Sequence, residues 1–170
     1  LIFDASECQK AYAQMKTTNS TMFSFLITTR SGKMVIGTNT RTAQGTISEQ
    51  GRAPSWNTEN VLSYKDGRAD TVVITGDEHK CIAANNQIIV TLQNCAVANK
   101  GASLAENAYT LRIGEQVQYV SAEDVFPVQR IFENITDNTL SLLIADSRGN
   151  QSGKTFPLDV IEYQLPTLQV

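Results

Sequence analysis

The segment at residues 21–38, TMFSFLITTRSGKMVIGT, determines the fold class that the sequence predicts. Apolar side chains recur at every second position on both sides of a turn at 30–32, namely Phe23, Phe25 and Ile27 before it and Met34 and Ile36 after it. Because side chains two positions apart point to the same face of a strand, each run fits a β-strand, and the glycine-containing turn joins the two. The segment therefore predicts a β-hairpin.

The rest of the chain carries further strand-like runs separated by turn-forming residues. They lie at 69–76, 82–84, 88–95, 109–120, 125–133 and 139–165, and the last is a long hairpin with its tip at 146–154. By contrast, residues 38–59 are polar, and only GTIS at 45–48 resembles a strand there. Pro127 cannot donate a ladder hydrogen bond, which favours an edge strand or a bulge. We expect about nine or ten short strands.

A helical pattern occurs near the start of the chain, in DASECQKAYAQMK at 4–16. Small or apolar residues recur there at steps of three and four, which places them on one face: Ala5, Cys8, Tyr12 and Met15. Asp4 or Ser6 is suited to cap the start of this helix. We therefore expect a single, mainly β domain over 1–170, with a helix at about 4–17, a β-rich body at about 21–165 and a short tail. Its body is an antiparallel β-sandwich or a partly closed barrel.

Composition points away from several classes of protein. Charged residues make up only 18% of the chain, and uncharged polar residues replace them, which is typical of extracytoplasmic proteins that are periplasmic, secreted or surface-exposed. The 14 basic and 17 acidic residues give a net charge of −3 without a basic run, so we expect no nucleic-acid partner. No apolar run approaches the roughly 20 residues of a membrane span. A start without methionine suggests a processed or truncated product.

Three cysteines raise the question of a disulfide. Cys81 and Cys95 flank a segment that is compatible with a hairpin, and we expect them to form a disulfide worth about 3 kcal/mol in the chain-entropy account. Cys8 lies on the apolar face of the expected helix, which favours a buried free thiol. It could instead pair with either of the other cysteines or with another molecule.

The segment GDEHKC places Asp77, Glu78, His79 and Cys81 close together. This spacing invites a metal site or a Cys–His nucleophilic pair. However, no CxxC occurs, and a single histidine cannot build a multi-histidine metal site. We therefore expect no metal and no cofactor.

Other motifs of enzymes are also missing. The run RGNQSGKTF ends like a phosphate-binding loop, but its two glycines enclose three residues instead of four, and a strand-like run containing Pro157 follows. The adjacent acidic pairs, Asp77–Glu78 and Glu123–Asp124, would point to opposite faces of a strand. Nothing in the sequence supports a catalytic role.

Trp56 is the only tryptophan, and it lies in the polar loop GRAPSWNTEN between Arg52 and Asn57. An exposed tryptophan beside such residues could contact a protein partner or a glycan. Alternatively, it folds back and covers one end of the body, which is the reading that we favour.

We predict a non-catalytic extracytoplasmic module for protein binding or assembly, whose partner docks on an exposed strand edge or on the Trp56 loop. Candidate edges are the strand that carries Pro127 and the final IEYQL at 161–165. Homo- or hetero-oligomers are compatible with this prediction. One alternative is a pilin-like filament or secretion-apparatus subunit. A second is a β-barrel for a small apolar ligand, lined by residues such as Phe23, Phe25, Tyr109 and Tyr119, and a hydrolase is the third.

Overall fold

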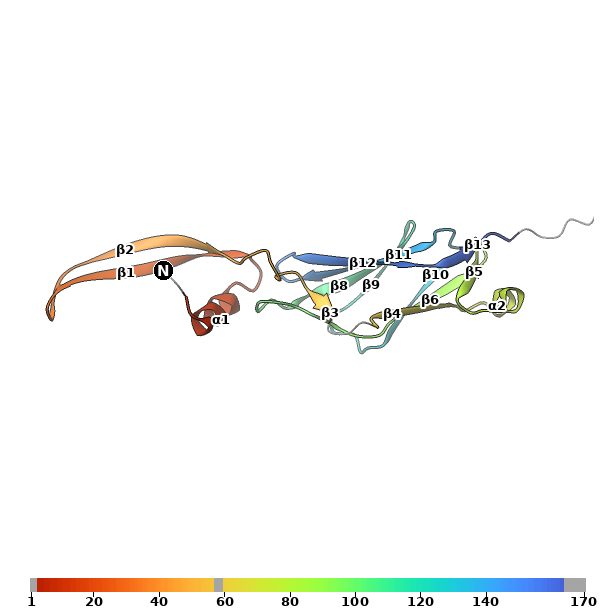
Figure 1. The fold of residues 1–170 in the computed structure, drawn as a ribbon, viewed down its shortest axis with the longest axis horizontal. Helices are drawn as coiled ribbons and strands as arrows, with labels where there is room; N and C mark the ends of the chain where they lie inside the picture. Colours follow the sequence, from red (N-terminus) through yellow and green to blue (C-terminus); the bar gives the residue numbers. More distant parts are fainter. Residues whose placement is uncertain (1–2, 57–59, 164–170) are drawn as a thin grey trace, which may run out of the picture.

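The computed structural model of the protein describes residues 3–56 and 60–163. Its helices are α1 (Ala5–Gln14) and α2 (Ala69–Thr75). Its strands are β1 (Ser20–Ser31), β2 (Met34–Thr46), β3 (Ser55–Trp56), β4 (Leu62–Asp66), β5 (Lys80–Ile82), β6 (Gln87–Leu92), β7 (Ala96–Val97), β8 (Leu104–Ile113), β9 (Gln116–Val120), β10 (Val128–Glu133), β11 (Thr139–Asp146), β12 (Gln151–Pro157) and β13 (Asp159–Ile161). The molecule is elongated, with the β1–β2 hairpin at one end and α2 at the other (Figure 1).

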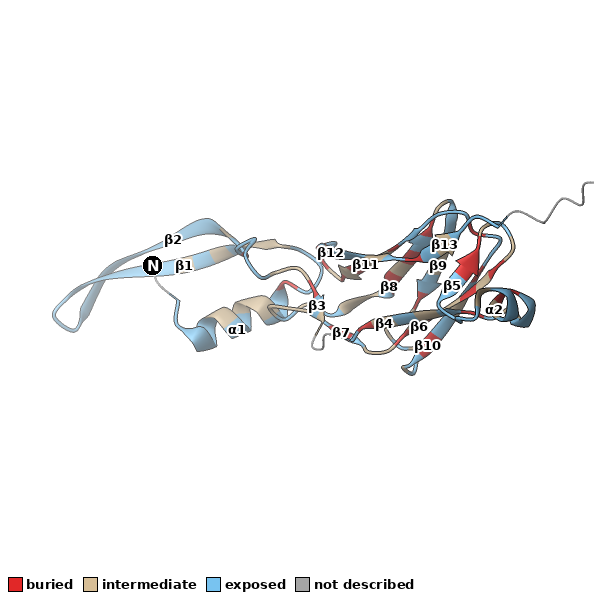
Figure 2. Cartoon of the chain, turned by 45° about the vertical axis from the view of Figure 1, so that its right-hand side comes forward, coloured by how far each residue is buried: buried red, intermediate tan, exposed pale blue. Residues whose placement is uncertain are grey.

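A β-sandwich forms the body. One sheet has the strand order β10-β6-β4, and the other has the order β12-β11-β8-β9. Strands at the centre of each sheet contain buried residues (Figure 2), which alternate along β6 and β11. Their apolar side chains pack together in one core. The largest of these core side chains are Ile88, Leu92, Tyr109, Leu111, Ile113, Phe132, Leu140, Leu142 and Ile144. The predicted antiparallel, mainly β fold with an N-terminal helix is confirmed, and the described strands do not close into a barrel.

Two short strand pairs complete the body. β13 pairs with β5 in parallel, and β3 pairs with β7 in antiparallel orientation. The predicted hairpins at 109–120 and 139–165 correspond to β8–β9 and β11–β12. Pro127 directly precedes β10, which forms one edge of its sheet, as the proline predicted.

Residues 69–76 were expected to form a strand, and this prediction is wrong, because they form α2. The buried Asp66 carboxylate explains the difference. It accepts hydrogen bonds from the backbone N–H of Arg68 and from the hydroxyl of Thr71, which fixes the chain in a turn at the start of the helix. Gly76, in the left-handed conformation, then ends it. A run of β-branched residues indicated a strand, but the hydrogen bonds that Asp66 accepts at the start of the run override that propensity.

The hairpin predicted from residues 21–38 is confirmed, but it is longer than expected. β2 continues to Thr46, and the register runs from Ser20 opposite Thr46 to Ser31 opposite Met34. At about 3.3 Å per residue, twelve residues of β1 span roughly 40 Å. We call this projecting β1–β2 hairpin, Ser20–Thr46, the arm.

The turn between β11 and β12 fastens α1 to the sandwich. The guanidinium of the buried Arg148 donates hydrogen bonds to the carbonyl oxygens of Tyr12 (3.1 Å) and Met15 at the end of α1, and to that of Lys100 (2.9 Å). Helix ends carry unpaired carbonyl groups and a partial negative charge, and α1 has no basic residue in its last turn. Arg148 therefore supplies from the sandwich the cation that the sequence of α1 lacks.

Further contacts fasten the base of the arm to the same turn. The side chains of Asn19 and Asn150 exchange two hydrogen bonds, at 2.9 and 3.1 Å, and the Ser147 hydroxyl donates to the carbonyl oxygen of Lys16 at 2.6 Å. The buried Asp146 carboxylate accepts hydrogen bonds from the backbone N–H groups of Arg148 and Asn150 and from the Asn150 amide. We refer to this turn, 146–150, and its contacts with 12–19 as the seam.

The seam generates a first prediction. Replacing Arg148 with methionine removes three charge-assisted hydrogen bonds, each worth about 1.5–3 kcal/mol. If the free energy of local opening of α1 falls by the value of one such bond, amide exchange in α1 should become about 10- to 100-fold faster. Exchange in the core strands should change less. Hydrogen-exchange mass spectrometry measures this. Arg112→Met, at an exposed arginine of β8, is the control, and unchanged exchange in α1 of Arg148→Met would contradict the assignment.

Candidate functional site

The arm exposes large apolar side chains that have no covering element in the described structure. Their exposed fractions are 70% for Leu26, 68% for Met34, 63% for Ile36, 61% for Met22, 52% for Ile27 and 47% for Val35. Five of these six lie in the half of the arm that is farther from the sandwich, and Figure 2 shows this half as exposed. Monomeric soluble proteins rarely expose contiguous apolar surface of this kind unless it binds something. We call these five residues, Leu26, Ile27, Met34, Val35 and Ile36, together with Arg30 and Lys33, the arm tip.

The base of the arm differs from its tip because aromatic rings cover each other there. The rings of Phe3 and Phe23 lie 5.4 Å apart between centroids, and those of Phe23 and Phe25 lie 6.4 Å apart. Phe23 also lies across the backbone of Gly45 in β2, where an added Cβ atom would come within 2.3 Å of its ring. Any larger residue at position 45 would therefore displace the Phe23 ring from its place against β2.

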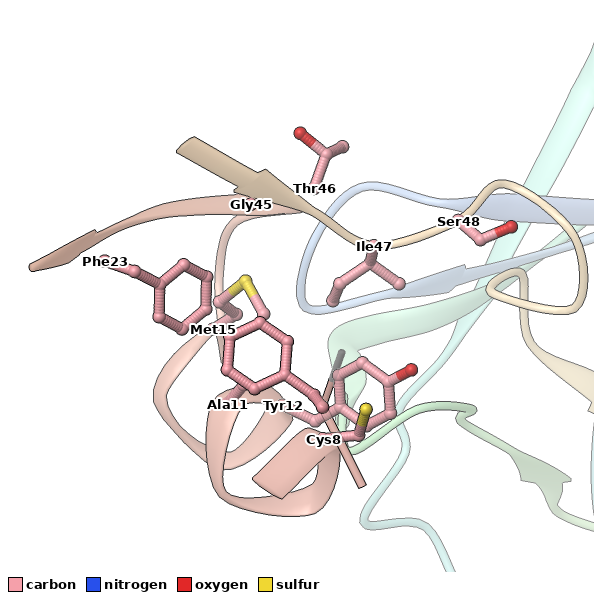
Figure 3. Close-up of a pocket in the computed structure, with 10 residues that line it drawn as sticks. Cys8, Ala11, Tyr12, Met15, Phe23, Gly45, Thr46, Ile47 and Ser48 are labelled. Carbon is pink, nitrogen blue, oxygen red and sulfur yellow. The ribbon is translucent and has the colours of Figure 1, made fainter. Parts of the chain in front are cut away.

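A small apolar cavity of about 270 Å³ separates α1 from the base of the arm. Figure 3 shows Cys8, Tyr12 and Met15 of the α1 segment facing Phe23 and Ile47 across it. The helical face predicted from the spacing of Cys8, Tyr12 and Met15 is the face that lines this cavity. Its volume is slightly below that of typical small-molecule sites, so we assign it to packing between α1 and the arm.

Charge is distributed unevenly between the arm and the remainder of the chain. No aspartate or glutamate occurs from Lys16 to Ser48, and the arm carries Arg30, Lys33 and Arg41. With a chain total of −3, three positive charges on the arm leave −6 for all other residues. The arm is therefore a basic element on an acidic protein.

The predicted lining of a ligand-binding barrel is not brought together. Tyr109 is buried in the core, Tyr119 is exposed, and Phe23 and Phe25 lie in the arm. The interior of the sandwich is filled by the core side chains instead.

Of the predicted partner or glycan contacts, Trp56 packs against the core of the sandwich. Its indole nitrogen is buried, and β3, which carries it, pairs with β7. Arg52 forms an ion pair with Glu49 at 3.3 Å, and Asn57 lies outside the described residues. Trp56 thus covers one end of the sandwich, and it is not presented as a surface anchor.

The predicted Cys81–Cys95 disulfide is absent, because all three cysteines are free. Cys81 points into the core from β5, whereas Cys95 lies beyond the far end of β6, whose five residue steps span roughly 17 Å. The expected pairing between these two segments does not occur, since β5 pairs with β13 and β6 pairs with β4 and β10. The sulfur of Cys95 instead contacts the hydroxyl of Tyr109 at 3.3 Å.

The chemistry suggested by the segment 77–81 is not assembled either. Burial raises the pKa of the Cys81 thiol to about 12, and the Asp66 and Asp159 carboxylates add to the shift, which is the opposite of an activated nucleophile. His79 is exposed, and its Nδ1 lies 3.4 Å from a carboxylate oxygen of Asp77. Within residues 3–56 and 60–163, no three His, Cys, Asp or Glu side chains come together as metal ligands. The same part of the chain contains no helix long and apolar enough to cross a membrane.

Sequence reasoning missed the arm tip, although two signals were present. Apolar residues at 25–27 and 34–36 are consecutive, so the period of two fails and apolar side chains must occupy both faces of the hairpin. The run from Lys16 to Ser48 without an acidic residue was the second signal. Together they indicate a basic hairpin with apolar side chains on both faces. A hairpin that is surrounded by water has no need of such side chains.

Comparison of the chain with models of protein families, with curated proteins and with solved structures finds no match.

A second prediction follows from the free thiols. In the native protein at pH 8, iodoacetamide should modify the exposed Cys95 rapidly and leave the buried Cys81 unmodified, because little Cys81 thiolate forms at that pH. Peptide mapping by mass spectrometry measures both rates. All three cysteines should react after denaturation without a reductant, and a linked Cys81–Cys95 peptide in that sample would contradict the structure.

Proposed function

We propose that this chain is a non-catalytic module for protein binding or assembly, and that it docks through the arm tip. The observation that carries the proposal is the set of five large apolar side chains exposed on the tip. Burying a leucine or isoleucine side chain is worth about 1.5–3 kcal/mol, so even part of this set supports specific association. The core of the sandwich does not need these residues, which supports a role between molecules.

The backbone of the arm also supports a protein partner. β1 and β2 form a two-stranded sheet, in which each strand pairs only with the other in the described part of the chain. The outer edges of both strands therefore offer N–H and C=O groups to an added strand, as in known modes of strand addition. Thr28, Thr38, Thr40 and Thr42 supply hydroxyl groups along the arm.

We further propose an extracytoplasmic location, meaning the periplasm, the cell surface or the medium. The low content of charged residues supports it. The free thiols add no support, since a disulfide was the second argument for an oxidising compartment.

Site-specific photo-crosslinking tests the role of the arm. A photoreactive phenylalanine analogue at Leu26 or Ile36, in the cells that produce the protein, should give discrete protein adducts on irradiation. The same analogue at Thr155, an exposed position on β12, is the matched control and should give at least tenfold less adduct. Equal yields at all three positions would show that the arm tip makes no specific protein contact and would overturn the proposal.

A further inference from the structure

The end of the molecule opposite the arm carries a second exposed apolar site. α2 packs against β5, β13 pairs with β5, and the buried Asn86 amide joins this region to the loop at 134–138 by donating to the carbonyl oxygens of Ile82 and Ile135. Figure 1 shows α2, β5 and β13 at the end of the sandwich remote from the arm. We call the surface formed by 65–80, 133–137 and 159–162 the α2 end.

Two of the apolar residues of α2, Val73 and Ile74, are exposed. Val73 is 82% exposed and Ile74 is 51% exposed, whereas the only buried residue of the helix is Thr71. The hydroxyl of Thr71 donates to the buried Asp66 carboxylate at 2.7 Å, so a polar contact fixes the orientation of the helix and leaves two β-branched apolar side chains in solvent. Such a short helix gains nothing from exposing these side chains, which indicates a surface that another molecule covers.

The charge of the α2 end is opposite to that of the arm. Apart from the buried Asp66, the α2 end contains seven acidic residues and three basic ones, which gives it a formal charge of −4. The acidic residues are Asp70, Asp77, Glu78, Glu133, Asp137, Asp159 and Glu162, and the basic residues are Lys65, Arg68 and Lys80. Two of the basic residues already form ion pairs, Arg68 with Asp70 at 3.3 Å and Lys65 with Glu78 at 3.8 Å. With these two pairs formed, the acidic side chains of the α2 end still outnumber its basic ones, so the α2 end favours a basic partner.

We propose that the arm tip of one copy docks on the α2 end of a second copy. This inference rests on the proposed function and names the partner of the same arm tip. Both surfaces combine exposed apolar side chains with charges of opposite sign, +2 on the arm tip from Arg30 and Lys33 and −4 on the α2 end, so they complement each other in both respects. Because the two surfaces lie at opposite ends of an elongated molecule, the contact is heterologous and repeats, giving head-to-tail chains.

An anionic membrane is the other acceptor that a basic, apolar hairpin suggests, and the charge of the chain disfavours it. The residues outside the arm carry a formal charge of −6, which opposes approach of the protein to a negative lipid surface. Arg30, Lys33 and Arg41 of the arm are instead attracted to the acidic α2 end of a second copy. Leu26 and Ile27 also project from opposite faces of the hairpin, which suits a protein surface that contacts both faces.

Complementation between two variants tests the interface. The arm variant carries Leu26→Asp and Ile36→Asp, and the α2-end variant carries Val73→Lys and Ile74→Lys, all at exposed positions that the fold does not need. Sedimentation velocity of the wild-type protein should show concentration-dependent association that weakens at least tenfold as salt rises from 50 to 500 mM. Each variant alone should be monomeric, and an equimolar mixture should form a dimer of one copy of each that does not grow further.

Controls separate the inference from the proposed function. Val125→Lys, at a site that is 89% exposed and outside both surfaces, should associate like the wild-type protein. Continued association of the α2-end variant would overturn the inference but leave the arm as a docking element. If the wild-type chain stays monomeric while its arm crosslinks to a different protein, the inference is also overturned and the arm remains a docking element. Arm-dependent flotation with phosphatidylserine vesicles, without association or protein crosslinks, would overturn both proposals.

Discussion

The structure depends on one buried cation, Arg148, which joins α1 and the arm to the sandwich together with the hydrogen bonds of Asn150 and Ser147. Its guanidinium binds the carbonyl groups at the end of α1, and the Asp146 carboxylate fixes the turn that presents it. Both charges are buried within one turn, so their opposite signs lower the cost of burying either. Because α1 leads directly into β1, this contact also sets the direction in which the arm leaves the sandwich.

Apolar residues are used differently on the two sides of the seam. In the sandwich, alternation along β6, β8 and β11 puts most of the large apolar side chains of these three strands into the core. In the arm, apolar side chains occupy both faces of a two-stranded sheet, which has too few strands to bury them. The aromatic rings at the base cover one another, and the tip stays exposed. An arm of this kind is stable as part of the protein because the seam supports its base, and its tip remains available for a partner.

Sequence alone predicted those elements whose patterns are local. The hairpin at 21–38, the cap at the start of α1, which is Asp4 of the two candidates, and the β11–β12 hairpin all follow from periodicity, caps and turn residues. It failed in two ways. The carboxylate of Asp66, just before the run at 69–76, accepts hydrogen bonds that start α2, and the spacing of apolar residues does not reveal them. Elsewhere distant residues decide the outcome, because the separate partners of β5 and β6 hold Cys81 and Cys95 apart. Arg148 was assigned to a hairpin tip, and nothing in its local sequence indicates that it binds a helix more than 130 residues earlier.

The most direct test of the account is a paramagnetic relaxation measurement on a mixed sample. One copy carries the α2-end variant and a spin label at Ser31→Cys, with Cys8 and Cys95 replaced by serine, and the other is a ¹⁵N-labelled arm variant. We predict that line broadening is strongest for the ¹⁵N signals of the α2 end, residues 65–80, 133–137 and 159–162, because the labelled arm tip then lies against it. Broadening of the ¹⁵N arm, or of no residue at all, would contradict the account.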